Sequence, residues 1–463
     1  MKGAGCNINL RPVFYPERVA VIGVNETPDR VGFNVFQGIL EGGFRGEVYP
    51  VHPRHDSILG RPVYKSIEDL PGPVDAAVIC LNQHATVEAA EKCGRMGVKG
   101  LICHAGGYRE MGEEGLILEA RLAETAEKYG MALVGPNSLG LINNDGDFYS
   151  TFYPLKLPRG NVSLISQSGG VGLTIMHRAI DEGMGINKFV GVGNCSTMGF
   201  ADYLEYFAED GGTSVIAVFM EGTDDARRFV EAAAKVTIKK PVVVLKSGRS
   251  EVSEYFAVTH TGSAAGSYRL YRDIFDQFGI LAVDSVSELI AACKGLSMLP
   301  LPRSNRIGII THTAGPSIIM SDILAGRGCV IPQLQQKTIE SVKKIIGEDP
   351  PVVLKNPLDA AGLGFMRNTF GKLAGAVLED EGIDLLVAVY CLHKNWGLPS
   401  NEIINTYKKH LKPVIACYAS HWEGCREDRE MLQREGIPLF TAPEDAAAAA
   451  AALVHQSKLR GGR

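Results

Sequence analysis

Short apolar runs alternate with helical stretches, and this alternation limits the possible folds more than any other feature of the sequence. In the first 150 residues such runs stand at 18–23, 74–81, 100–106 and 131–136. Each run suits one buried strand, and each intervening segment has room for a helix. The alternation predicts α/β domains in which helices cover both faces of a parallel sheet.

Two proline-rich segments divide the chain. Its 463 residues correspond to about three domains at roughly 100–200 residues each. YPLKLPRG follows residue 152 and LPLPRSNR occupies 299–306, and proline breaks both helix and sheet. We expect domains at 1–150, 151–298 and 306–463, with 299–305 as a linker.

The composition excludes several classes of protein. With 47 basic and 52 acidic residues there is no electrostatic case for nucleic-acid binding. No run approaches the roughly 20 apolar residues of a membrane span, and the start, MKGAGCNINLRP, lacks the core of a signal peptide. The ten cysteines form no C-x-x-C pair, so neither disulfides nor a metal site is indicated. We expect a cytoplasmic protein that binds neither nucleic acid nor membrane.

The first predicted strand is followed by a glycine turn and a helix, a unit typical of nucleotide-binding domains. The G-x-G-x-x-G fingerprint is absent. Only Gly23 and Gly32 remain, with Asn25 and Arg30 between them, which suits a phosphate-bearing ligand held partly by side chains. The second strand, 47–51, ends in HPRH without an acid to bind the ribose of NAD. A nicotinamide oxidoreductase is therefore the weaker alternative.

Two further turns follow predicted strands. Residues 166–172, SQSGGVG, place hydroxyls and glycines at a helix start, where free backbone N–H groups and the helix dipole favour an anion. An ordinary serine N-cap would have the same sequence. Residues 135–140, GPNSLG, lie at the carboxyl edge of the first sheet, although G-P-N is also common turn chemistry.

The segment KSGRSEVSEYFAVTHTGSAAGS, 246–267, contains the candidate nucleophile. It leaves the apolar run 242–245 and leads into a helical stretch. His260 is flanked by Thr261, Gly262, Ser263 and Gly266. Neutral imidazole is a nucleophile and a general base, and the small neighbours let donors approach an anion. A loop histidine that only caps or packs would fit this spacing equally well.

These motifs and their order resemble those of the NDP-forming acyl-CoA synthetases, relatives of succinyl-CoA synthetase. The resemblance extends over nearly the whole chain. The resemblance implies that 246–267 is the swivelling phosphohistidine segment and that His260 carries the phosphoryl group. Glu221, in a match to I-E-G, would orient the imidazole, although a solvated acid at a strand end is the alternative. The implied phosphate and acyl-substrate residues are Ser166, Gln167, Ser168, Gly169, Gly170, Gly193, Asn194, Thr261 and Gly262. Cys195 and Ser196 replace the family's lysine and alanine.

The resemblance also implies that the first domain binds coenzyme A. Asn25 and His52 stand where the family has serine and asparagine. The implied CoA contacts are Gly23, Asn25, Arg30, Gly32, His52, Pro53, Pro136, Asn137 and Ser138.

The last third of the chain repeats the middle third. IGIITHTAGPSIIMSD, from 307, resembles VSLISQSGGVGLTIMH, from 162, and KPVIACYASHWEG, from 412, resembles KPVVVLKSGRSE, from 240. The repeat predicts two related flavodoxin-like domains after a Rossmann-like CoA-binding domain, all with doubly wound parallel sheets. The copy has no T-H-T-G-S loop, so we expect its His312 and His421 to be structural.

The implied function is that of an α subunit interconverting acyl-CoA, phosphate and ADP with carboxylic acid, CoA and ATP, through an acyl phosphate and a phosphohistidine. Neither an ATP-grasp domain nor a G-x-x-x-x-G-K-[ST] loop is recognised. Nucleotide and Mg²⁺ are therefore expected on an ATP-grasp β subunit, in an α2β2 assembly. A non-catalytic CoA- or acyl-CoA-binding regulatory subunit is the alternative.

Overall fold

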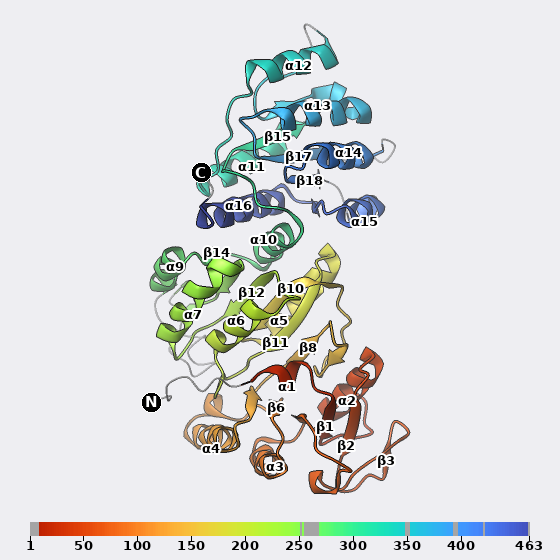
Figure 1. The fold of residues 1–463 in the computed structure, drawn as a ribbon, viewed down its shortest axis with the longest axis vertical. Coiled ribbons are helices and arrows are strands. Elements are labelled where there is room, and N and C mark those ends of the chain that lie inside the picture. The colour runs from red at the N-terminus through yellow and green to blue at the C-terminus, as the bar shows by residue number, and fades with distance from the viewer. Residues whose placement is uncertain are drawn as a thin grey trace. The chain divides into compact units, whose positions relative to one another are not determined.

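The computed structural model describes residues 9–250, 252–253, 268–347, 352–391, 397–419 and 422–461. His260, Thr261, Gly262 and His421 lie outside the described residues. The chain divides into two compact units, Met1–Val283 and Asp284–Arg463. Their elements are labelled in Figure 1.

The first sheet has the order β2-β1-β5-β6-β7, with every neighbouring pair parallel. Alternate residues of β1 enter different cores: Val19 and Val21 face one side, and Ala20 and Ile22 the other. Both faces are apolar because α2 covers one and the adjacent α3 and α4 cover the other. The strands are β1 (Arg18–Ile22), β2 (Glu47–Val51), β5 (Ala76–Ile79), β6 (Gly100–Cys103) and β7 (Ala132–Val134), with a hairpin of β3 (Ser57–Ile58) and β4 (Arg61–Pro62). The helices are α1 (Arg11–Phe14), α2 (Val31–Gly42), η1 (Ile67–Asp69), α3 (Gln83–Arg95), η2 (Arg109–Met111) and α4 (Glu113–Tyr129).

The second sheet, also in the first unit, has the order β14-β13-β12-β10-β11-β8-β9. Strands β10 to β14 are parallel, and the hairpin of β8 and β9 adds an antiparallel edge beside β11. Residues 140–149, expected in the first domain, thus pair with the second sheet. The strands are β8 (Gly140–Asn143), β9 (Phe148–Tyr149), β10 (Arg159–Ser166), β11 (Ile186–Gly191), β12 (Val215–Met220), β13 (Val242–Lys246) and β14 (Leu281–Val283). The helices are α5 (Gly169–Glu182), α6 (Phe200–Glu209), α7 (Ala226–Lys239) and α9 (Tyr268–Gln277).

The second unit contains a sheet of order β16-β15-β17-β18-β19, again parallel throughout. Helix α10 packs against α16 in this unit, ahead of the 299–305 segment that was expected as the linker. The strands are β15 (Ile307–Thr311), β16 (Leu358–Asp359), β17 (Leu385–Cys391), β18 (Val414–Ala419) and β19 (Leu439–Phe440). The helices are α10 (Val286–Met298), α11 (Ala314–Gly326), α12 (Gln336–Ile346), η3 (Ala361–Phe365), α13 (Arg367–Glu379), α14 (Ser400–His410), η4 (Trp422–Cys425), α15 (Arg426–Arg434) and α16 (Pro443–Leu459).

In all three large sheets the first parallel strand lies between the second and the third, which is the doubly wound order of flavodoxin-like folds. The predicted α/β class is confirmed. A shared detail supports the predicted repeat. Lys240 and Lys412 each stand directly before the proline that precedes a strand. They donate to carbonyl oxygens near the ends of α6 and α13, including those of Phe207 and Leu378.

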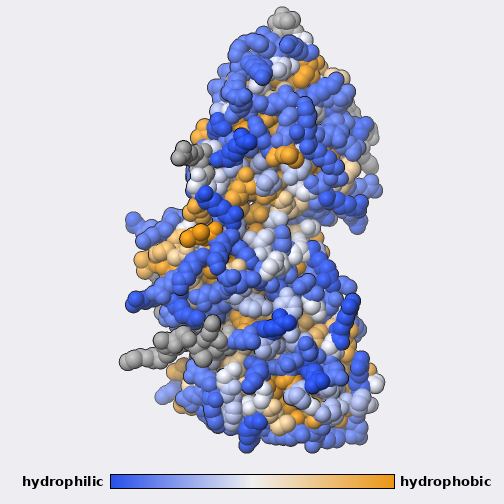
Figure 2. All heavy atoms as spheres, viewed as in Figure 1, coloured by the Kyte–Doolittle hydropathy of each residue, from blue (hydrophilic) through white to orange (hydrophobic). Residues whose placement is uncertain are grey.

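Hydrophilic residues cover most of the face shown in Figure 2, and apolar residues form small separate groups. None of the helices in the described ranges combines the length and the apolar character needed to span a bilayer.

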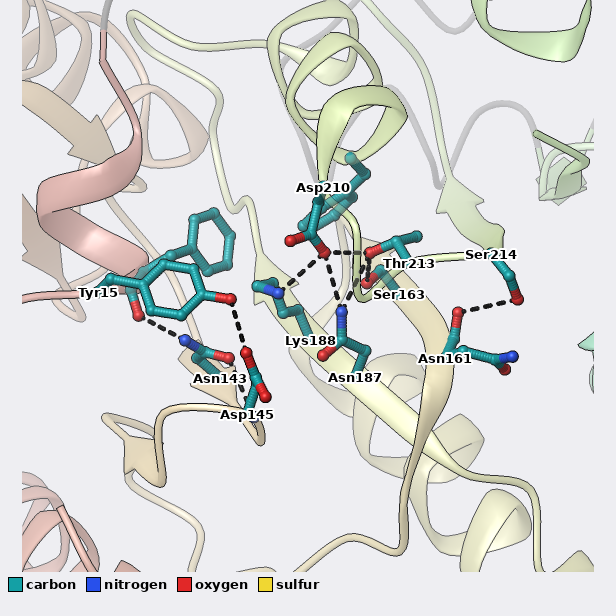
Figure 3. A network of polar contacts seen from close by, with 12 residues as sticks. Tyr15, Asn143, Asp145, Asn161, Ser163, Asn187, Lys188, Asp210, Thr213 and Ser214 are labelled. Atoms are coloured by element: carbon teal, nitrogen blue, oxygen red, sulfur yellow. Dashed lines mark hydrogen bonds and ion pairs between the residues drawn. The ribbon is translucent and has the colours of Figure 1, made fainter. Parts of the chain in front are cut away.

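An ion pair with a fully buried lysine lies in the second sheet's domain, beside Tyr15 of the amino-terminal segment (Figure 3). Lys188 on β11 is fully buried, and its Nζ lies 2.9 Å from Asp210 Oδ2 and 5.1 Å from the ring centre of Tyr15. Asn187 and Thr213 also donate to Asp210. Burial would raise the pKa of Asp210, but the hydrogen bond from Thr213 and the Lys188 charge lower it below its ordinary value.

We predict that Lys188→Met destabilises the first unit by about 3–5 kcal/mol, because it leaves the Asp210 carboxylate buried without its counter-ion. Urea unfolding at neutral pH measures the change. The exposed pair of Lys239 with Glu209 is the matched control, and Lys239→Met should cost less than about 1 kcal/mol. Since the folded pKa of Asp210 is lowered, the wild-type contribution is complete at neutral pH and is lost as the pH falls below 3.8. Equal effects of the two substitutions would contradict the assignment.

Candidate functional site

The turn after β1 brings the start of α2 against the end of the strand. Gly23 has a φ of +91°, a value that side chains rarely allow. A Cβ on Gly32 would lie 2.1 Å from the Gly23 carbonyl oxygen, so no larger residue fits without displacing the backbone. Helix α2 therefore begins at the carboxyl edge of the first sheet with no side chain at Gly32. Backbone N–H groups at such a helix start can bind a phosphate.

The polar side chains around this turn form hydrogen bonds within their own loops. Asn25 Oδ1 accepts from the Thr27 N–H at 3.1 Å, and His52 Nδ1 accepts from the Arg54 N–H at 3.2 Å. Partial burial, followed by neighbouring basic groups, lowers the pKa of His52. The side chain of Arg30 does not cap α2, and both Arg30 and Arg54 are exposed. Two guanidinium groups thus remain accessible in the loops that follow β1 and β2.

The turn from Gly135 to Ser138 closes the other end of this edge. The Asn137 N–H donates to the Ala105 carbonyl at 2.7 Å, and Asn137 has a φ of +57°. The Ser138 hydroxyl donates to the Gly191 carbonyl of the second sheet. The turn is therefore connected to both sheets.

His104, at the end of β6, supports the same turn. It is buried, and its Nδ1 donates to the Ser138 carbonyl at 3.0 Å. Burial lowers the pKa of His104 to about 4, so the ring is neutral at pH 7 with its proton on Nδ1.

In the second sheet, β10 leads through Ser166 and Gln167 into α5. The Ser166 hydroxyl donates to the Ser168 carbonyl at 2.7 Å, and Ser168 Oγ accepts from the Val171 N–H at 3.4 Å. Ser168 is thus an N-cap. A Cβ on Gly170 would meet no atom of the described residues within 4 Å, so none of them covers this side of the helix start. Capping and anion binding are compatible here, since one hydroxyl occupies only one of the free N–H groups.

The loop after β12 is tied to the loop after β10. Gln167 Oε1 accepts from the backbone N–H groups of Glu221 at 2.7 Å and Gly222 at 3.1 Å. Glu221 is only 8% exposed, so it is not the freely solvated acid of the alternative interpretation. The Ser247 N–H donates to the Met220 carbonyl at 3.0 Å, which places the start of the His260 segment beside Glu221.

The loop after β11 meets the turn of the first domain. The Asn194 N–H donates to the Pro136 carbonyl at 3.0 Å, and the Ser196 N–H to the Gly135 carbonyl at 3.3 Å. A Cβ on Gly193 would lie 2.1 Å from the Pro136 oxygen. The carboxyl edges of the first two sheets therefore face each other in direct contact.

The structure thus places one group of the predicted residues at the contact between the first two sheets. A second group lies away from this contact. The gathered group comprises Pro136, Asn137, Ser138, Ser166, Gln167, Ser168, Gly169, Gly170, Gly193, Asn194 and Glu221. The residues at the ends of β1 and β2 are separated from the β7 turn by β5 and β6. They comprise Gly23, Asn25, Arg30, Gly32, His52 and Pro53.

Several largely buried polar residues at this junction were missed from the sequence. The Asn194 amide donates to Glu110 Oε2 at 2.8 Å and to Glu119 Oε2 at 2.9 Å. Arg109 lies beside them and pairs with Glu119. These acids are 84 and 75 positions from Asn194, and charged residues in and near a helix are ordinarily exposed. No signal in a single sequence reveals them.

The geometry offers an anion site on α5, a buried carboxylate next to it, and a histidine segment that starts alongside. No group of three His, Cys, Asp or Glu side chains suited to a metal ion occurs among the residues described. The start of α5 and the Glu221 carboxylate are groups suited to hold a phosphoryl group and to orient an imidazole.

Comparison with known proteins gives consistent matches over the whole chain. Residues 17–144 match a CoA binding domain, and residues 159–296 match a succinyl-CoA ligase like flavodoxin domain. The chain is 38% identical to the α subunit of the ADP-forming acetate–CoA ligase II of Pyrococcus furiosus, over 97% of this chain and 98% of that one. It is 35% identical to the α subunit of ligase I of that organism, over the same shares.

A solved structure agrees with these matches. The dinucleotide-forming acetyl-coenzyme A synthetase 1 of Ca. Korarchaeum cryptofilum, in complex with phosphate and ADP, is 31% identical and has a TM-score of 0.90. The alignment covers 98% of each chain. Sequence, domain content and fold agree: this chain belongs to the family of ADP-forming acetyl-CoA synthetase α subunits.

Proposed function

We propose that this protein is the α subunit of an acid–thiol ligase that interconverts acyl-CoA, phosphate and ADP with carboxylic acid, CoA and ATP. The observation that carries the proposal is the contact between the Gly135–Ser138 turn and the loop after β11. This contact brings the edge of the CoA-binding domain close to the start of α5, where backbone N–H groups can hold a phosphate. Transfer between a thioester and a phosphoryl group requires such proximity.

CoA would lie along the carboxyl edge of the first sheet. The bare start of α2 at Gly32 suits its phosphates, and Arg30 and Arg54 add positive charge in the adjoining loops. Gly23, Asn25, His52 and Pro53 would shape that end of the site. The reactive thiol end would reach the turn at Pro136, Asn137 and Ser138, because that turn contacts the second sheet.

The phosphoryl group would be held at the start of α5 by backbone N–H groups of Gly169 and Gly170, with Ser166, Gln167 and Ser168 fixing the loop. Gly193 and Asn194 would border the acyl group. In the first step a phosphate oxygen attacks the thioester carbon, the C–S bond breaks, and CoA leaves as the thiolate. The product is an acyl phosphate.

In the second step an imidazole nitrogen of His260 attacks phosphorus, the P–O bond to the acyl group breaks, and the carboxylate leaves. Thr261 and Gly262 would contact the phosphoryl group, and Glu221 would accept the other imidazole N–H and stabilise the charged ring. A β-phosphate oxygen of ADP then takes the phosphoryl group. We assign ADP and Mg²⁺ to an ATP-grasp β subunit in an α2β2 assembly, because no nucleotide motif was recognised in this chain.

This assignment keeps the expected order of a CoA-binding domain, a phosphohistidine domain and a third domain. The expected bounds 1–150, 151–298 and 306–463 shift, since residues 140–149 pair with the second sheet and α10 packs in the second unit. A CoA-binding regulatory subunit without catalysis is the competing function, and the labelling experiment below separates the two.

We predict that the first domain binds CoA and not NAD. Calorimetric titration of the purified chain should give binding heat with CoA and none with NAD at the same concentration. Gly32→Ala should abolish CoA binding because its Cβ would clash with the Gly23 carbonyl. Gly38→Ala on the same helix is the control, since its Cβ has no described neighbour nearer than 3.5 Å. Binding of NAD but not CoA would refute the assignment.

We predict that the complete enzyme, given acetyl-CoA and radiolabelled phosphate, acquires an acid-labile, base-stable phosphoryl group on His260. His260→Ala should abolish both label and turnover, and Glu221→Gln should lower the label several-fold. His177→Gln, at an exposed histidine on α5, is the control and should label normally. Full turnover by His260→Ala would show that another group carries the phosphoryl.

We predict that the chain alone forms no ATP from acetyl-CoA, phosphate and ADP, while the chain co-purified with an ATP-grasp subunit does. A luciferase assay follows ATP in both preparations. ATP synthesis by the isolated, contaminant-free chain at the rate of the complex would mean that it contains its own nucleotide site.

A further inference from the structure

A largely buried arginine lies where the two carboxyl edges meet, and none of the roles proposed above uses it. Arg109 stands in η2 of the first domain, with its side chain 12% exposed. Its Nε lies 3.1 Å from Glu119 Oε1, and its Nη1 donates to Asp224 Oδ2 at 2.7 Å. The guanidinium thus bridges a helix of the first domain and a loop of the second.

Glu119, the first partner of Arg109, is hydrogen-bonded to the loop after β11. Glu119, on α4, is 5% exposed. Besides Arg109, its carboxylate accepts from the Asn194 amide at 2.9 Å and from the Ser196 hydroxyl at 2.6 Å. Glu110 accepts from the same amide, so both Asn194 Nδ2 hydrogens are used within the protein. Asn194 therefore fixes the loop and has no N–H left to donate to a substrate.

Asp224, the second partner of Arg109, lies in the loop after β12. Asp224 is three residues beyond Glu221, the carboxylate proposed to orient His260. Its side chain is 37% exposed, so Arg109 is the buried partner of the pair. Arg109 thus contacts the loop after β12 directly and the loop after β11 through Glu119.

The charges in this cluster support a fixed arrangement. Burial would lower the pKa of Arg109, but Glu119 and Asp224 outweigh that effect and raise it. Burial would raise the pKa of Glu110, but the hydrogen bonds from Asn194 and from backbone N–H groups lower it. Arg109 and Glu110 are therefore ionised near neutral pH, and the Arg109 charge has two carboxylate partners.

We propose that Arg109 is a positioning residue for acyl and phosphoryl transfer, which holds the loops after β11 and β12 in register with the CoA-binding domain. The inference rests on the proposed function. Arg109 touches neither the bare start of α2 nor the loops of His52 and Arg54 in the described contacts, so affinity for CoA should not depend on it. Transfer should depend on it, because a displacement of about 1 Å between reacting groups can cost on the order of 100-fold in rate.

The test uses the complex of this chain with its co-expressed partner, and three variants at the bridge. Arg109→Lys keeps the charge but replaces a rigid fork by a single ammonium, which cannot span both carboxylates. Asp224→Asn removes the second branch at an exposed position and should not affect folding, and Asp224→Glu restores the carboxylate. Arg306→Lys, at the Arg306–Asp384 pair of the second unit, is the matched control.

Three quantities are measured: the CoA dissociation constant, the initial rate of phosphohistidine formation from acetyl-CoA and phosphate, and the kcat and KM for acetyl-CoA. For Arg109→Lys and Asp224→Asn we expect CoA affinity within about twofold of wild type and kcat at least tenfold lower. Asp224→Glu should recover much of the rate, and Arg306→Lys should match wild type.

Unchanged kcat in Asp224→Asn and Arg109→Lys would overturn the inference, and so would a tenfold loss of CoA affinity, which would place Arg109 in the CoA site. If Arg109→Lys fails to fold, Asp224→Asn and Asp224→Glu decide the question. Absence of label in the wild-type complex would instead refute the proposed function.

Discussion

The close contact of the Gly193 backbone with the Pro136 carbonyl is the constraint on which the candidate site depends. A side chain at residue 193 would lie 2.1 Å from that oxygen, so the two sheets can approach this closely only with glycine there. The approach aligns the carboxyl edge of a CoA-type domain with the start of α5. A ligand extending along the first edge is thereby directed to the second, which is why two domains can share one reaction.

Such an approach buries charge, and the fold supplies partners for it. Arg109 pairs with two carboxylates at the carboxyl edges, and Lys188 pairs with Asp210 near the amino ends of the strands. A buried ion without its partner is costly by several kcal/mol. The Arg109–Asp224 pair therefore links the first two domains at the carboxyl edges, while the Lys188–Asp210 pair lies within the second domain.

The repeat within the chain shows which features belong to the fold and which to the site. His312 Nε2 accepts the Cys391 N–H at 2.9 Å in the second unit, just as Gln167 accepts the Glu221 N–H in the first. Both hold the loop after the third strand, so the contact belongs to the doubly wound fold. This agrees with a structural role for His312. Only the first unit has a carboxylate at this position, which supports a special role for Glu221.

The sequence alone determined the α/β class, the internal repeat and the glycine-rich helix starts, because these follow from local periodicity and from residues close in the chain. It also suggested the family through motifs such as S-Q-S-G. Only the tertiary structure decided that residues 140–149 join the second sheet, that Asn194 is occupied by two buried acids, and that Arg109 bridges the domains. The contacts of Asn194 with Glu110 and Glu119, and of Arg109 with Asp224, join residues more than 70 positions apart. No residue close in the chain indicates which partner such a charge will have.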